Sequence, residues 1–219
     1  MSTIKYKVIL LGNYNSGKTT LFNKIKKGKD PFQDNIKSIG TDQISLNLNL
    51  DVGKNGVNTK QSFEVNIVET AGKKEFIKLT KNYFHGSDGF LLTYDITDKT
   101  SFEDIEMWVN SIKEEKTGCT DSKYAIILIG FTSNVGVENN ERVVTEEEGY
   151  EKCEKLNLIW GGEHDIKNMI YDDVKKLIDA YIKEIYDVFD GKTTESINKI
   201  IKLGQVKKEK SSCVSNKSK

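Results

Sequence analysis

The stretch GNYNSGKTT, residues 12–20, constrains this chain more than any other, because it directly follows the apolar run IKYKVILL. That run predicts a buried strand over 4–11, and a helical pattern follows over 17–27. The spacing Gly12-x-x-x-x-Gly17-Lys18-Thr19 between a strand and a helix is typical of a phosphate-binding loop. Glycines let backbone N–H groups curl around phosphates, and the N-terminus of the helix adds positive potential.

The loop therefore predicts binding of a nucleoside phosphate. Lys18 would reach the terminal phosphates, and the hydroxyl of Thr19 is placed to bind a Mg²⁺ ion that bridges the outer phosphates. The nucleotide-binding residues expected from this stretch are Gly12, Asn15, Ser16, Gly17, Lys18, Thr19 and Thr20.

Short apolar runs alternate with longer helical patterns along the chain, which predicts an α/β fold with a mostly parallel, six-stranded sheet flanked by helices. The Asn55-Gly56 pair favours a tight hairpin and hence one antiparallel pairing. We expect one domain over 1–189 and a basic, flexible tail over 190–219. The expected strands are 4–11, 44–50, 63–68, 89–94, 124–129 and 156–159, and the expected helices are 17–27, 74–84, 101–116, 145–155 and 166–189.

Composition excludes several classes of protein. Lysine plus arginine and aspartate plus glutamate number 33 each, so net charge indicates no particular partner. The three cysteines lack metal-ligand spacing, and the apolar runs are too short for a signal peptide or a membrane span. We expect a reduced, cytoplasmic monomer with no nucleic-acid partner. Neither His85 nor His164 has a nucleophile or carboxylate at a suggestive spacing, so we expect a structural role at the surface for both.

Further motifs narrow the class. ETAGKKEF (69–76) resembles the DTAGQERF switch of Ras-like GTPases, and SIGTD (38–42) resembles the TIGVD of Rab switch I. Residues 81–114 follow, without a gap, the Rab pattern of an aromatic pair, GxxxxxYD-TD-SF and WxxxI. The chain thus resembles a divergent Rab-type small GTPase from about residue 4 to 189. The resemblance implies the P-loop small GTPase fold, GTP or GDP as ligand, Mg²⁺ as cofactor and a role in vesicle traffic.

The resemblance also assigns roles to individual residues. Ser38 takes the place of the switch I threonine that binds Mg²⁺ and senses the γ-phosphate, with Thr41 as a weaker alternative. Glu69 replaces the aspartate that holds Mg²⁺ through water, and we expect its extra methylene to weaken metal binding. Gly72 matches the glycine that follows the γ-phosphate. The expected metal ligands are Thr19, Ser38 and Glu69.

Two segments, 31–43 and 69–80, correspond to the switches of the family. They would order around the γ-phosphate and expose a surface to effector or regulator proteins.

Two departures from the family pattern predict impaired hydrolysis. Lys73 occupies the position of the catalytic glutamine, and a charged lysine donates hydrogen bonds but cannot accept the proton of the attacking water. It could still place a positive charge near the γ-phosphate. Tyr14 stands where the family carries glycine or serine, and its ring would crowd the space that an arginine finger enters. No catalytic residue is assigned.

The base-reading motifs are altered as well. In place of GNKxD the chain reads Gly130-Phe131-Thr132-Ser133-Asn134, and the amide of Asn134 pairs less well with guanine than an aspartate does. An amide would suit xanthine, but weaker guanine selectivity is the favoured interpretation. The family motif SAK aligns with residues 162–164, where its letters are lost and a backbone N–H could still serve.

The tail suggests contact with a membrane surface. Residues 202–219 hold six lysines and one glutamate, and Cys213 lies six residues from the end, where ordinary prenylation is not expected. The lysines would attract an anionic leaflet, and acylation of Cys213 would supply a second anchoring signal. The alternative is a solvated tail.

Three functions remain open at this point. The first is a Rab-like switch that binds guanine nucleotide with Mg²⁺ and hydrolyses it poorly. The second is a pseudo-GTPase that serves as an interaction scaffold with little or no nucleotide cycling. The third, a phosphotransferase using ATP, is disfavoured because residues 20–190 contain no lid for an acceptor substrate.

Overall fold

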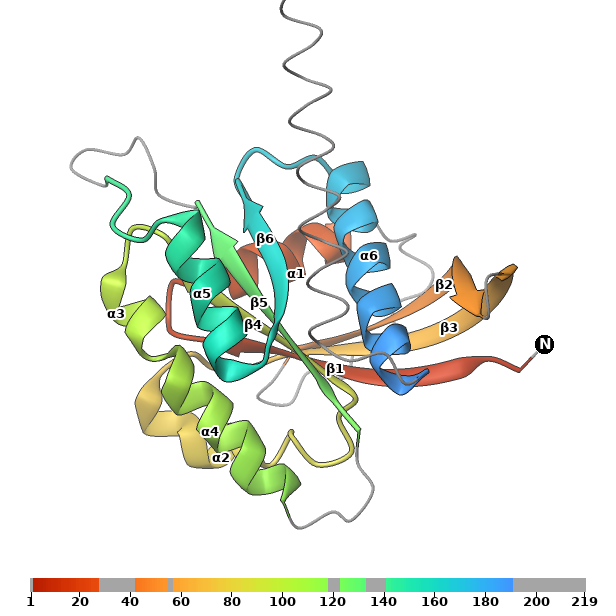
Figure 1. Ribbon diagram of the computed structural model, residues 1–219, viewed down its shortest axis with the longest axis horizontal. Helices are drawn as coiled ribbons and strands as arrows, with labels where there is room; N and C mark the ends of the chain where they lie inside the picture. Colours follow the sequence, from red (N-terminus) through yellow and green to blue (C-terminus); the bar gives the residue numbers. More distant parts are fainter. Residues whose placement is uncertain (1, 28–41, 55–56, 118–122, 133–140, 191–219) are drawn as a thin grey trace, which may run out of the picture.

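Strand β1 (Ile4–Gly12) organises the sheet, because β3 (Val57–Glu69) and β4 (Gly89–Asp95) pair with it on either side. The computed structural model describes residues 2–27, 42–54, 57–117, 123–132 and 141–190. Its six-stranded sheet has the order β2-β3-β1-β4-β5-β6 (Figure 1). Strand β2 (Gln43–Lys54) is antiparallel to β3, and the other neighbours are parallel, including β5 (Ala125–Phe131) and β6 (Ile159–His164). The predicted α/β fold is confirmed.

The core lies on both faces of this sheet. Successive residues of a strand point to opposite faces, and in β1 the side chains of Val8 and Leu10 join one apolar cluster while those of Ile9 and Leu11 join the other. Strands β4 and β5 are buried along their whole length. Their continuous apolar sequences follow from this position between two layers of helices.

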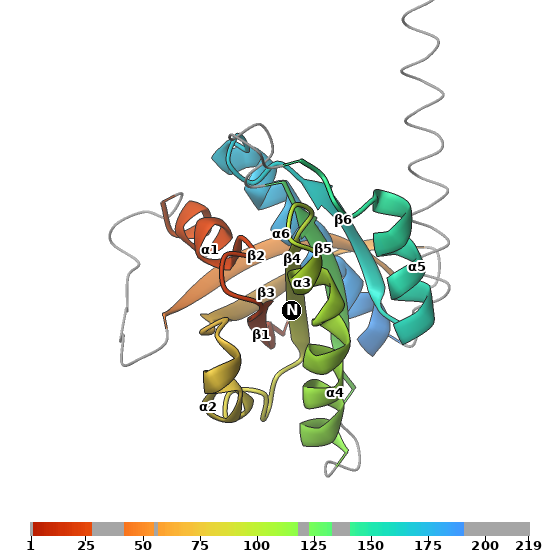
Figure 2. The ribbon, with the colours of Figure 1, turned by 90° about the vertical axis from the view of Figure 1, so that its left-hand side faces the viewer.

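The helices divide between the two faces. On one face α1 (Lys18–Lys27) packs beside α6 (Tyr171–Phe189), and both contribute to the first cluster. The second cluster contains side chains from α3 (Lys99–Glu103), α4 (Ile105–Lys116) and α5 (Glu146–Leu156). The short α2 (Ile77–Lys81) packs against α4 on that same side (Figure 2). Within the described residues, no helix has the length and apolar character needed to span a bilayer.

Several helix boundaries differ from the sequence prediction. The expected helix 74–84 is a 3-10 turn, η2 (Lys74–Phe76), followed by α2, and the expected helix 101–116 is divided at Asp104 into α3 and α4. The last helix begins at Tyr171 rather than at 166, because Asp165 accepts hydrogen bonds from the backbone and side-chain nitrogens of Asn168 and closes a turn there.

The bounds of three strands, β2, β3 and β6, also differ from the sequence prediction. The pairing of β2 with β3 runs from Gln43 opposite Val68 to Lys54 opposite Val57, so polar residues extend both strands beyond their apolar centres. The expected strand 156–159 begins late because Asn157, with φ of 58°, ends α5 in a left-handed conformation. Strand β6 therefore starts only at Ile159.

Candidate nucleotide-binding site

The loop between β1 and α1 has the backbone conformation that its glycines predict. Gly12, Asn15 and Gly17 have positive φ angles of 135°, 64° and 88°. A Cβ at Gly12 would lie 2.2 Å from the carbonyl oxygen of Thr93, and one at Gly17 would lie 2.4 Å from the ring of Phe131. Conformation and space both require glycine at these two positions. Helix α1 begins immediately afterwards, at Lys18.

Lys18 is the buried cation of the site, with 5% of its surface exposed. Its Nζ donates to the carbonyl oxygens of Gly12 (2.9 Å) and Asn13 (2.5 Å) and, at 3.3 Å, to the hydroxyl of Ser16. Burial lowers the pKa of the ammonium from 10.5 to about 8, and the nearby Glu69 carboxylate opposes that shift. A desolvated cation of this kind gains strongly from an anionic ligand.

A cavity of about 710 Å³ lies beside this loop, within the size range of small-molecule sites. The loop, the start of α1 and the segment after β3 form most of its wall. Of the sequence-predicted residues, the cavity brings together Asn15, Gly17, Lys18, Thr19, Thr20, Glu69 and Gly72; Asp42, Thr70, Ala71, Phe76 and Lys167 also line it, as do Tyr14 and Lys73.

Gly72 closes tightly onto the loop. Its carbonyl oxygen accepts a hydrogen bond of 2.9 Å from the backbone N–H of Tyr14. A Cβ at Gly72 would lie 2.5 Å from the Nζ of Lys18, from the carbonyl carbon of Asn13 and from the backbone nitrogen of Tyr14. The segment after β3 can thus reach the ammonium only because residue 72 has no side chain.

Thr19 and Glu69 meet at the mouth of the cavity, where the Thr19 hydroxyl donates a short hydrogen bond to the Glu69 carboxylate. Burial is the largest influence on Glu69 and raises the pKa of its carboxyl group, and Asp42 raises it further. A hydroxyl beside a partly buried carboxylate suits Mg²⁺, which takes one or two protein carboxylates and completes its octahedron with phosphates and water. Among the residues described, no cluster of three or more His, Cys, Asp or Glu forms a metal site.

A network of polar groups, some of them buried, links the loop and η2 to α4 and to the residue before it. Asn13, with 8% of its surface exposed, accepts a 2.8 Å hydrogen bond from the indole nitrogen of Trp108 and donates one of 2.6 Å to Asp104. The same carboxylate oxygen of Asp104 lies 2.6 Å from the Nζ of Lys74, in η2. Strand β4 adds a contact of 2.7 Å between the hydroxyls of Ser16 and Thr93.

At the end of β5, beside the loop, an apolar side chain takes the place of the polar one in the family pattern. Phe131, in the position of the family asparagine, is fully buried with its ring against Gly17. A second hollow of about 250 Å³ lies beyond Thr132 and shares Lys167 with the first. Lys24 in α1 donates to the carbonyl oxygens of Lys167 (2.9 Å) and Met169 (2.7 Å), which fixes this part of the wall.

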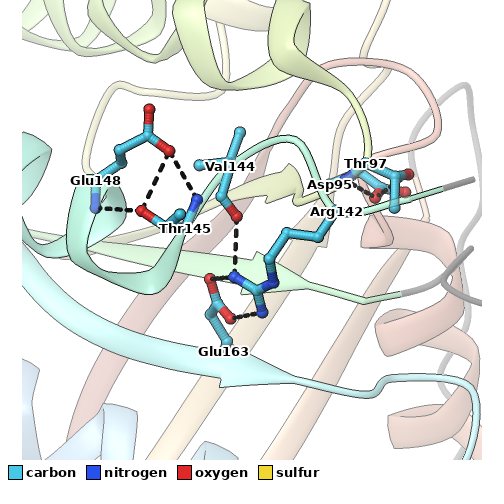
Figure 3. Close-up of polar contacts among 7 residues, drawn as sticks. All are labelled: Asp95, Thr97, Arg142, Val144, Thr145, Glu148 and Glu163. Carbon is cyan, nitrogen blue, oxygen red and sulfur yellow. Dashed lines mark hydrogen bonds and ion pairs between the residues drawn. The ribbon is translucent and has the colours of Figure 1, made fainter.

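Residues 162–164, which we aligned with the SAK motif, lie in strand β6 and do not line either cavity. Glu163 instead forms a two-point ion pair with Arg142, at 3.1 and 2.5 Å, and Arg142 also donates to the carbonyl oxygen of Val144 (Figure 3). The neighbouring Thr145 and Glu148 form a capping box at the start of α5. These contacts stabilise the segment 142–148 against β6. Lys167, in the loop after β6, lines the cavity.

The two histidines differ in their exposure to solvent. His85 is exposed, as expected. His164 is half-buried rather than at the surface, with its Nε2 at 2.8 Å from the carbonyl oxygen of Gly161 and 3.1 Å from the hydroxyl of Tyr181. Burial lowers the pKa of His164.

Some predicted residues lie outside the described ranges. They are Ser38, Thr41, Asn134 and Cys213, together with residues 31–41 of the first switch and 191–219 of the tail. Their assigned roles stay predictions.

Three residues of the site were missed by sequence reasoning. Asp42 is the last letter of SIGTD, yet its carboxylate had been given no role. Asp104 falls within the Rab-like pattern of 81–114, but its link to the loop depends on the division between α3 and α4. Lys167 belongs to no motif, and only the packing of its loop against α1 brings it to the cavity.

Together, a strand–loop–helix phosphate cradle, a buried lysine and a hydroxyl–carboxylate pair define a P-loop nucleotide-binding α/β domain. Comparison with known proteins agrees with this class. The model of the Ras family matches residues 7–187. Ras-related protein YPTC6 of Chlamydomonas reinhardtii is 26% identical over 200 residues, which cover 91% of this chain and 84% of the relative.

Two further relatives give similar values. Ras-related protein RabC of Dictyostelium discoideum is 28% identical over 187 residues, covering 82% of this chain and 87% of the relative. GTP-binding protein ypt4 of Schizosaccharomyces pombe is 28% identical over 153 residues, or 69% of this chain and 60% of that protein. The chain belongs to the Ras family and is a small GTPase of the Rab type.

Proposed function

We propose that this protein is a molecular switch that binds GTP and GDP with Mg²⁺ and hydrolyses GTP poorly. The observation that carries the proposal is the joint position of Lys18, Thr19, Glu69 and Gly72 around one cavity, with Lys73 beside them. The first four supply what a nucleotide and its metal require, whereas Lys73 replaces the glutamine that would orient water.

Each residue has a distinct role in binding. Lys18 and the loop N–H groups hold the β- and γ-phosphates, and Gly72 follows the γ-phosphate. Thr19 and Glu69, with Ser38, would hold Mg²⁺, which supplies charge neutralisation across the outer phosphates when it is bound. Asn134 would contact the base and allow weaker guanine selectivity.

Two side chains beside the phosphate-binding loop support the proposal of slow hydrolysis. Lys73 offers only donors, so it cannot position an attacking water through an accepted hydrogen bond. Tyr14 is 64% exposed and lines the cavity, and in this proposal its ring obstructs the entry of a partner's arginine. That finger supplies a rate factor of roughly 10³–10⁵ in the enzymes that use it.

Signalling would pass through the two switch segments, 31–43 and 69–80, to effector and regulator proteins in vesicle traffic. We propose a cytoplasmic monomer that contacts the cytosolic face of an intracellular membrane through its basic tail and Cys213. Sedimentation with anionic vesicles, compared between the full chain and a chain ending at residue 190, tests the tail: equal sedimentation would contradict this part.

A pseudo-GTPase scaffold is the second candidate, and the packing of the loop favours it. Phe131, Trp108 and Asp104 hold the loop through the protein's own side chains. A loop held in this way does not need a nucleotide to keep its shape, as a permanent scaffold would require.

A competition titration on nucleotide-free protein separates the candidates. GTP, GDP, XTP and ATP are each titrated with and without Mg²⁺. Tight guanine binding that strengthens with Mg²⁺ supports the switch. Absence of binding to all four would contradict it and leave the scaffold, and a preference for ATP would contradict both.

A further inference from the structure

Two consecutive lysines, Lys73 and Lys74, lie within the second switch segment (69–80) and have different surroundings. Lys74 is paired with Asp104 at 2.6 Å, and the aspartate side chain is only 16% exposed. The lysine side chain is 52% exposed, so the pair is partly screened by solvent. Because the same carboxylate oxygen accepts from the side chain of Asn13, the pair ties the start of η2 to the phosphate loop.

Lys73 is exposed and lines the cavity. It follows Gly72, whose Cα lies so close to Lys18 that an added Cβ would come within 2.5 Å of the Nζ. The backbone bond from Tyr14 to Gly72 holds this segment in place. Two interactions therefore hold the backbone of Lys73 beside the phosphate-binding loop: the Lys74–Asp104 ion pair after it and the Tyr14–Gly72 hydrogen bond before it.

Lys18 and Lys73 both line this cavity, together with Lys167 on the side of the loop after β6. The loop and Lys18 suffice for a diphosphate, whereas a triphosphate brings further negative charge to the side where the second switch closes. A second cation at that side lowers the free energy of the triphosphate complex more than that of the diphosphate complex.

We infer that Lys73 is a ligand of the terminal phosphate that makes the site selective for nucleoside triphosphate over diphosphate, and that Lys74 acts on it as a positioning residue. The inference rests on the proposed function, because it concerns the same nucleotide site. It gives the lysine a binding role in addition to the loss of the glutamine: the residue that slows hydrolysis also retains the triphosphate.

The test measures the affinities of a non-hydrolysable GTP analogue and of GDP, both with Mg²⁺, by calorimetry on nucleotide-free protein. For Lys73→Ala we expect the analogue to bind about tenfold more weakly and GDP to stay within about twofold. Lys73→Arg should retain most of the wild-type selectivity because it keeps the charge. Lys113→Ala, an exposed lysine of α4 that does not line the cavity, is the matched control and should change neither affinity.

Lys74→Ala tests the positioning role. We expect it to lower the ratio of the two affinities about threefold in the wild-type background and to have no effect in the Lys73→Ala background, since coupled residues deviate from additivity. Equal effects in both backgrounds would show that Lys74 acts independently of Lys73 and overturn this part.

The two proposals can fail separately. If the wild type binds both ligands and Lys73→Ala leaves their affinity ratio unchanged, the selectivity role is refuted while the switch stands. If the wild type binds neither ligand, both proposals are refuted together.

Discussion

Replacement of Gly72 by alanine should separate triphosphate binding from folding. The added Cβ would lie 2.5 Å from three atoms, and two of them belong to the backbone of the phosphate loop. These cannot yield as a flexible side chain can, so the segment must move and the 2.9 Å bond from Tyr14 is lost. The overpacking costs about 1–3 kcal/mol and the hydrogen bond about 1 kcal/mol.

The sum, about 2–4 kcal/mol, corresponds to a loss of about 30- to 1,000-fold in affinity for a non-hydrolysable GTP analogue. GDP should be affected far less, because the loop and Lys18 hold a diphosphate without the second switch. In the free protein, Ala71 and residues 73–76 are exposed and can shift to relieve the overpacking without opening the core. Global stability should therefore fall only by about 1 kcal/mol, the value of the lost hydrogen bond, whereas the closed conformation bears the full cost.

Calorimetry with both ligands and thermal unfolding of the free protein measure these quantities. Gly53→Ala is the matched control, because a Cβ there would lie no closer than 3.4 Å to its neighbour, Asn58. Wild-type affinity of Gly72→Ala for the triphosphate analogue would refute the proposed closure of this segment on the γ-phosphate.

Three other predictions concern Lys18, Trp108 and Glu69. Burial lowers the pKa of Lys18 from 10.5 to about 8, so between pH 8 and 10.5 only the unfolded chain keeps the proton, and the stability of the ligand-free protein should rise over this range. Nucleotide affinity should instead fall about tenfold from pH 8 to 9.5, because the ammonium loses its charge. An affinity measured by calorimetry that does not change with pH would contradict this. Trp108→Phe leaves the side-chain oxygen of Asn13 without its 2.8 Å donor and should lower the free energy of unfolding by about 1–3 kcal/mol in urea; an unchanged midpoint would show that the bond is dispensable. Glu69→Gln should abolish most of the Mg²⁺ dependence of GTP binding while affinity without Mg²⁺ stays similar, as titration in EDTA would reveal; equal Mg²⁺ dependence would place the metal elsewhere.

The sequence predicts the elements whose residues carry a local signal. Strands β4 and β5, and β1 from Val8 onward, read as apolar runs because both of their faces are buried, and the phosphate loop is specified by its glycines. The extension of β2 and β3 is missed, since polar residues there pair through their backbones and leave no apolar pattern. The late start of β6 depends on the left-handed conformation of Asn157, which the apolar pattern does not reveal.

The candidate site divides in the same way. Lys18, Thr19, Glu69 and Gly72 are found from motifs, because each acts within one short stretch of chain. The contacts of Asp104 with Asn13 and with Lys74 join positions about 90 and about 30 residues apart, respectively, and no local pattern indicates such pairs. Tertiary packing determines these contacts.

Single-turnover hydrolysis tests the central claim most directly, namely that this is a GTP-binding switch slowed by the lysine at position 73. GTP and Mg²⁺ are added to a slight molar excess of protein over GTP, and GDP formation is followed for the wild type and for Lys73→Gln. We predict a wild-type rate constant below about 10⁻⁴ s⁻¹ and an increase of at least about tenfold in Lys73→Gln. A wild-type rate equal to that of Lys73→Gln would contradict the account.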